Sequence, residues 1–111
     1  MKIFVYGSLK QQEDNHDKMQ RANGEFLFPA VTVKRYYVQD NWFYKSLVDN
    51  YLENHAEFIE GEVYEVPDDN VEYLDAFEDP LERKEIQVEF ENIKIPVQCY
   101  FEKDKNVNTH K

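Results

Sequence analysis

The fold is decided by residues 60–90, which read EGEVYEVPDDNVEYLDAFEDPLERKEIQVEF. Apolar and polar residues alternate over 60–66 up to a proline, and this alternation predicts a strand. An amphipathic helix is predicted over 70–78, because three apolar residues recur at helical spacing, namely Val71, Leu74 and Phe77. Alternation resumes over 85–90 and predicts a second strand.

The rest of the chain adds further strands around this unit. Residues 2–6 form a short apolar run that predicts a buried strand, and a short helix is expected over 16–21. Aromatic and β-branched residues give 25–39 a strand-like pattern, and 93–101 forms a last strand. About six strands, two short helices and little room for βαβ units predict an α+β fold. The expected architecture is a small mixed β-barrel with short flanking helices.

Length and composition limit the possible functions. The 111 residues, 41% of them hydrophobic, suffice for one domain, predicted over 1–102 and followed by a polar tail, 103–111. The net charge of −10 argues against binding to nucleic acid or to an anionic membrane surface. Apolar runs stay far below the roughly 20 residues of a membrane span. The single cysteine, Cys99, cannot form an internal disulfide, which favours a cytoplasmic location.

Two kinds of site are not expected. Three scattered glycines cannot build a glycine-rich phosphate loop. The histidines His16, His55 and His110 are far apart in sequence, so we expect no metal site. Cys99 stands inside a predicted strand, which favours a small buried hydrophobe over a nucleophile.

A first candidate binding element is the tetrapeptide Tyr6-Gly7-Ser8-Leu9, directly after the first predicted strand. Glycine allows a sharp turn there, and successive free N–H groups in such a turn suit a carboxylate. The alternative is an ordinary turn, which the spacing alone favours.

The second candidate is Glu78, at the C-terminal end of the predicted helix and close to its apolar face. A carboxyl group that points into a partly apolar cavity has a raised pKa and can exchange protons near neutral pH. The alternative is an ordinary surface acid, as its neighbours Asp75, Asp79 and Glu82 suggest.

The order of these segments resembles the γ-glutamylcyclotransferase-like family, which includes the AIG2-like and γ-glutamylamine cyclotransferase branches. The resemblance extends over residues 3 to about 101. The segments that carry it are FVYGSLK at 4–10, NH at 15–16, EGEVYEV at 60–66, LDAFE at 74–78 and ERKEIQV at 82–88.

The resemblance implies an enzyme with a pocket at the mouth of a small barrel and with no metal or organic cofactor. Such an enzyme acts on a small γ-glutamyl substrate and releases 5-oxoproline by intramolecular cyclisation. The family's substrate-binding loop corresponds to Tyr6, Gly7, Ser8 and Leu9, whose backbone amides hold the γ-glutamyl group. Its catalytic glutamate corresponds to Glu78.

The chain departs from the family pattern at three places. Asp79 stands where the family often has glycine, Leu81 where it often has tyrosine, and 44–47 reads YKSL in place of Tyr-Pro-x-Leu. These departures bear on the substrate and on the leaving-group side of the pocket.

Several roles stay open at this point. Tyr6, Tyr44 and Tyr100 are candidates to line the pocket, and Arg83 is expected on the surface or paired with Glu78 or Asp75. Two other functions compete with the enzyme: a catalytically silent member that binds a small ligand or a protein, and an interaction domain that uses exposed aromatics such as Trp42 and Phe43.

Overall fold

The computed structural model describes residues 1–6, 16–40, 45–48, 56–79 and 81–101. In this part of the chain the elements are β1 (Lys2–Val5), α1 (His16–Arg21), β2 (Glu25–Thr32), β3 (Tyr37–Asp40), β4 (Lys45–Val48), β5 (Glu60–Glu65), the 3₁₀ turn η2 (Asp68–Asn70), α2 (Val71–Glu78), β6 (Glu82–Phe90) and β7 (Ile93–Phe101). The predicted domain boundary at residue 102 lies outside the described residues.

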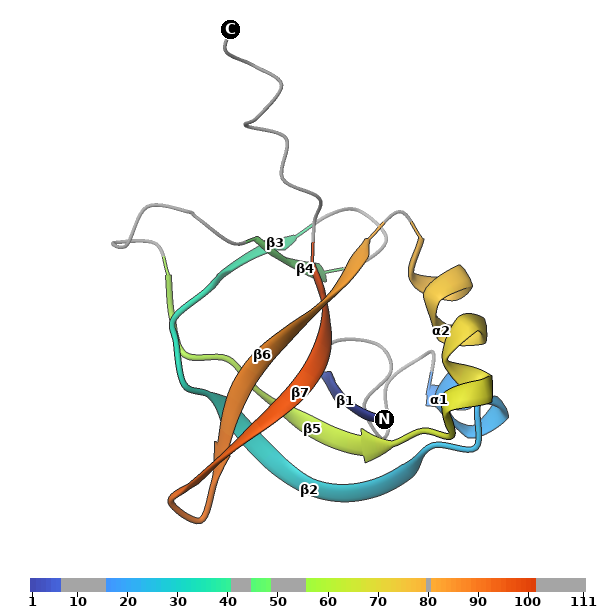
Figure 1. Cartoon of the computed structure of the whole chain (residues 1–111). Helices are drawn as coiled ribbons and strands as arrows, with labels where there is room; N and C mark the ends of the chain where they lie inside the picture. Colours follow the sequence, from blue (N-terminus) through green and yellow to red (C-terminus); the bar gives the residue numbers. More distant parts are fainter. Residues whose placement is uncertain (7–15, 41–44, 49–55, 80, 102–111) are drawn as a thin grey trace, which may run out of the picture.

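Five strands close into a barrel in the order β1-β5-β2-β6-β7 (Figure 1). Four of the pairings are antiparallel, and the ring is closed by a parallel pairing of β1 with β7 at Ile3 and Gln98. The antiparallel pair β3–β4 extends the sheet through a parallel contact of β4 with β7 at Leu47 and Phe101. The predicted α+β fold, a small mixed barrel with short flanking helices, is therefore confirmed.

The strand-like pattern over 25–39 proves to be two strands, so the described residues hold seven strands where about six were expected. Thr32 marks the break. Its hydroxyl donates to the carbonyl of Lys34 at 2.7 Å and accepts from the N–H of Ile59 at 2.9 Å. A side chain that bonds to nearby backbone in this way competes with the continuing ladder, and β3 pairs with β4 instead.

Side chains from the two faces of the barrel wall form two apolar clusters. The interior cluster contains Phe4, Ala30, Tyr36, Ile59, Val63, Ile86, Val88, Val97, Cys99 and Phe101. The outer cluster lies between the barrel and both helices and contains Ile3, Val5, Met19, Ala22, Tyr64, Val66, Val71, Leu74, Leu81 and Tyr100. Successive residues of β7 thus point to opposite faces. Cys99 faces the interior and is 0% exposed, as predicted for a small buried hydrophobe.

Gly61 is required where β5 passes β1 closely. A methyl group at this position would collide with the carbonyl oxygen of Val5 and lie 2.7 Å from Cζ of Phe4, a buried core ring. The backbone and a packed ring cannot move aside without disturbing the core, and overpacking of this kind lowers the free energy of unfolding by about 1–3 kcal/mol. We therefore expect Gly61→Ala to lower the free energy of unfolding by that amount in urea denaturation.

The matched control is Glu60→Ala, one residue away at an exposed position. Surface substitutions of this kind change stability by about 0.5 kcal/mol or less. Equal unfolding midpoints for Gly61→Ala and Glu60→Ala would contradict the close approach of β1 to β5.

Candidate active site

Helix α2 positions Glu78 at one end of the barrel. Val71 and Leu74 are buried on the barrel side of the helix, and Phe77 packs against the same cluster. The helix ends at Glu78, and its carbonyl accepts the N–H of Leu81 at 2.9 Å. Asp79 is extended, as the residue before a proline usually is. The predicted helix over 70–78 is confirmed except for its first residue, which belongs to η2.

Burial changes the acidity of Glu78. The side chain is partly buried, and this desolvation raises the pKa of its carboxyl group from 4.5 to about 7. No described residue forms an ion pair with it. A carboxyl group in this state can both accept and donate a proton near neutral pH.

Two neighbours on β7 locate this carboxylate. Burial raises the pKa of the Cys99 thiol, and the nearby charge of Glu78 raises it further. The pKa of Tyr100 is also raised, first by burial, then by Asp75, and also by Glu78. The carboxylate of Glu78 therefore lies close enough to Cys99 and Tyr100, near the end of β7, for its charge to act on both side chains.

Tyr6 reaches the same end of β7 from β1. Its hydroxyl donates to the carbonyl oxygen of Tyr100 at 2.8 Å, and its ring packs against the interior cluster. Tyr6 and Glu78, two of the five predicted site residues, therefore both border Tyr100. The other three, Gly7, Ser8 and Leu9, lie outside the described residues.

Tyr100 is bound to α2 through Asp75. It is 3% exposed, and its hydroxyl donates to Oδ1 of Asp75 at 2.6 Å. Arg83 on β6 donates to the same carboxylate from Nε to Oδ1 at 3.0 Å and from Nη2 to Oδ2 at 3.2 Å. Arg83 was expected on the surface or paired with Glu78 or Asp75, and in the structure it is paired with Asp75.

The hydrogen bond from Tyr100 to Asp75 was missed in the sequence. Alternation along β7 carried the signal, because Tyr100 must face opposite to Cys99 and hence toward the helices. Which residue of α2 accepts this hydrogen bond depends on how β7 is aligned with β6, and the sequence alone does not show that alignment. The third tyrosine proposed for the pocket, Tyr44, lies outside the described residues.

The described residues contain no group of three or more His, Cys, Asp or Glu side chains that could hold a metal ion. No described helix is long and apolar enough to cross a membrane. The expected lack of metal and cofactor stays a prediction.

A model of the family described as "Gamma-glutamyl cyclotransferase, AIG2-like" matches residues 3–111. The chain belongs to this family. The predicted resemblance is confirmed.

Known relatives are similar over most of the chain. A candidate gamma-glutamylcyclotransferase of Vibrio cholerae is 33% identical over 88 residues, which is 78% of this chain and 70% of that protein. The gamma-glutamylaminecyclotransferase of Bos taurus is 31% identical over 106 residues, or 88% of this chain and 62% of the bovine protein. The crystal structure of a Mus musculus AIG2-like protein superposes with a TM-score of 0.77 at 26% identity, covering 92% of this chain and 76% of that one.

Proposed function

We propose that this protein is a γ-glutamyl cyclotransferase that converts a γ-glutamyl amine or γ-glutamyl amino acid into 5-oxoproline and the free amine. The observation that carries the proposal is Glu78, a partly buried carboxyl group with a pKa of about 7 beside the end of β7. Membership of the family and similarity to a bovine gamma-glutamylaminecyclotransferase support it.

The proposed reaction uses Glu78 as its general acid and base. The substrate's own α-nitrogen attacks its γ-carbonyl carbon, so the C–N bond of the lactam forms and the C–N bond to the leaving amine breaks. Glu78 accepts a proton from the attacking nitrogen and donates a proton to the leaving nitrogen. The α-ammonium loses two protons in all, and the amine departs with both as an ammonium ion. No water is consumed.

We propose that the backbone amides of Gly7, Ser8 and Leu9 hold the glutamyl end of the substrate next to Tyr6. Fixing the α-carboxylate restricts the α-amine to positions near the γ-carbonyl, and such orientation contributes a large part of the rate of intramolecular reactions.

Gly7→Val tests this loop. A β-branched side chain would crowd the turn that we propose at Gly7, so we expect KM to rise about tenfold, which corresponds to about 1.4 kcal/mol of binding. Initial rates across substrate concentration measure KM, and thermal unfolding checks that the variant is folded. A folded Gly7→Val protein with an unchanged KM would contradict the proposed loop.

A panel of γ-glutamyl compounds, each assayed for 5-oxoproline, tests the function itself. It should include γ-glutamyl dipeptides and γ-glutamyl alkylamines, because these differ only in the leaving group. Formation of 5-oxoproline from a member of the panel supports the enzyme. Binding without turnover across the panel would favour the catalytically silent binding module.

A further inference from the structure

The end of α2 carries two carboxylates on one face. Asp75 and Glu78 are three residues apart, a spacing that places side chains on the same side of a helix. Both act on Tyr100, whose pKa is raised first by burial and then by the two carboxylates. Like charges at this helical spacing oppose each other's ionisation unless one of them is compensated.

The two carboxylates differ in their compensation. Asp75 accepts two hydrogen bonds from Arg83, at 3.0 and 3.2 Å, and a third from the Tyr100 hydroxyl at 2.6 Å. Glu78 has no ion-pair partner among the described residues, and burial is the cause of its raised pKa. The negative charge of Asp75 is therefore balanced by Arg83. Glu78 has no such partner among the described residues, so its carboxyl group can gain or lose a proton near neutral pH.

The sheet register explains why Arg83 reaches Asp75. Arg83 and Tyr100 are directly paired across β6 and β7, so their side chains leave the same face of the barrel wall. That face carries α2, and both side chains meet the Asp75 carboxylate there. Arg83 also lies 3.4 Å from Oε1 of Gln98 on β7.

The elements around the end of α2 contribute several titratable or charged groups. On α1, Lys18 places its Nζ 5.7 Å from the centroid of the Phe77 ring and is paired with Asp17 at 3.7 Å. The other groups in the described residues are Asp75 on α2, Cys99 and Tyr100 on β7, Arg83 on β6 through Asp75, and Tyr6 after β1 through the carbonyl of Tyr100. Cys99 and Tyr100 are buried and their pKa values are raised, so both are neutral at neutral pH. Asp75 and Arg83 are then the charged pair bound to Tyr100, and Lys18 lies beyond Phe77 with Asp17 as its own partner.

We propose that Arg83 is a positioning residue of the candidate active site, which balances the charge of Asp75 and thereby keeps that charge from acting on Glu78. The Arg83–Asp75–Tyr100 unit also ties the last turn of α2 to β6 and β7, which holds Glu78 at the end of the barrel. The importance of Arg83 for catalysis rests on the proposed function. The effect of Arg83 and Asp75 on the ionisation of Glu78 does not.

The test is a titration of the Glu78 carboxyl carbon by NMR in protein with ¹³C-labelled glutamate, where the Glu78 signal is identified by its loss in Glu78→Gln. Arg83→Gln leaves Asp75 uncompensated, so the midpoint of Glu78 should rise by about 1–2 pH units. Asp75→Asn leaves Arg83 uncompensated, so the midpoint should fall. The double variant Asp75→Asn/Arg83→Gln should return close to wild type.

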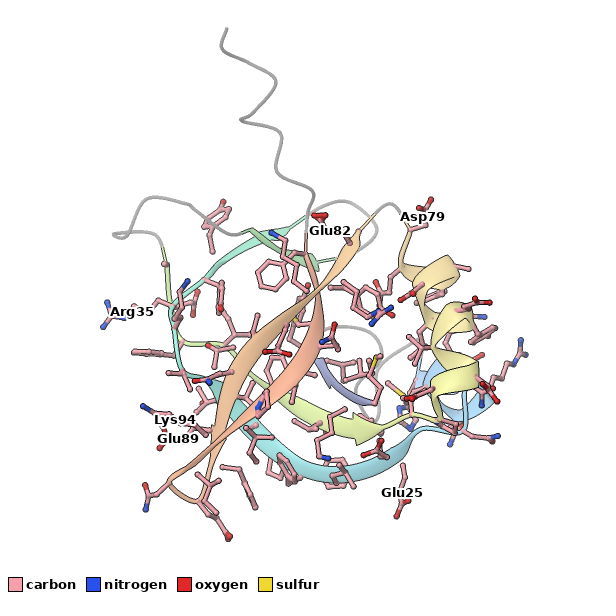
Figure 2. The ribbon with its side chains drawn as sticks, in the orientation of Figure 1. Glu25, Arg35, Asp79, Glu82, Glu89 and Lys94 are labelled. Carbon is pink, nitrogen blue, oxygen red and sulfur yellow. The ribbon has the colours of Figure 1, made fainter. Side chains whose placement is uncertain are left out.

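Two controls separate this role from a purely structural one. Arg83→Lys keeps the positive charge and should stay close to the wild-type midpoint. Lys94→Gln makes the same charge change as Arg83→Gln at an exposed position beside the β6–β7 turn, far from α2 (Figure 2), and should leave the midpoint unchanged. A shift of the Glu78 midpoint that came only from disturbed packing would not be reversed in the double variant.

An unchanged midpoint in Arg83→Gln, or a double variant that moves further from wild type, would overturn the proposal. If Arg83→Gln does not fold, Asp75→Asn still decides, because the proposal requires a lowered midpoint there. The titration needs no substrate, so its failure is distinct from a failure to form 5-oxoproline.

Discussion

Glu78→Gln is expected to slow the formation of 5-oxoproline by at least about a hundredfold. A general acid or base contributes about 10²–10⁴-fold to a rate, and glutamine keeps the size of the side chain while losing proton exchange. KM should change little, because the loop at Gly7–Leu9, and not this carboxylate, is proposed to hold the glutamyl end. Initial rates with the best substrate of the panel measure both quantities.

Two neighbouring acids serve as matched controls. Asp79 points outward from the end of α2, and Glu82 lies at the start of β6 (Figure 2). Asp79→Asn and Glu82→Gln remove the same charge without touching the proposed proton transfer, so both should keep nearly full activity. Turnover by Glu78→Gln within a few-fold of wild type would show that another group transfers the proton.

The same substitution should stabilise the protein in a pH-dependent way. The pKa of Glu78 is about 7 in the folded protein against 4.5 for the free side chain, so the folded state binds its proton more tightly. Stability is then lost as pH rises from about 4.5 to 7, and the cost above pH 7 reaches about 3 kcal/mol. Glu78→Gln removes this cost.

Chemical denaturation at pH 5 and pH 8 measures the effect. The stability difference between Glu78→Gln and wild type should increase by about 2 kcal/mol between these pH values in favour of the variant. Asp79→Asn, at an exposed position, should show no such increase. A difference that is independent of pH would mean that Glu78 is solvated like an ordinary surface acid.

The elements of residues 60–90 could be predicted because local patterns determine them. Period-two alternation in β6 and helical spacing in α2 each reflect one buried face, whereas β5 buries side chains on both faces, Val63 inside the barrel and Tyr64 outside it. The structure has these elements nearly where they were expected. The identity of Glu78 as a candidate followed from the end of that helix and from the family resemblance. The choice between a buried carboxyl group and a surface acid could not be made from the sequence, because burial depends on how separate elements pack around the end of the helix.

Long-range pairing and side-chain hydrogen bonds account for what the sequence did not show. The strand break at Thr32 depends on its bond to Ile59, 27 residues away. The parallel pairing of β1 with β7 depends on closure of the whole ring. The contact of Asp75 with Tyr100 and Arg83 likewise joins separate elements, so only the possible pairing of Arg83 could be anticipated.

Some predictions remain untested by the described residues. Gly7, Ser8 and Leu9, and the aromatic pair Trp42 and Phe43 of the interaction-domain hypothesis, lie outside them. The cytoplasmic location stays a prediction from the single cysteine.

The most direct test of the central claim is the fate of oxygen when the purified protein acts on a γ-glutamyl compound in ¹⁸O-labelled water. Cyclisation consumes no water, so we expect unlabelled 5-oxoproline and free amine in equal amounts. Glutamate with ¹⁸O in its γ-carboxyl group would show that water, and not the α-amine, attacks the γ-carbonyl, and would contradict intramolecular cyclisation.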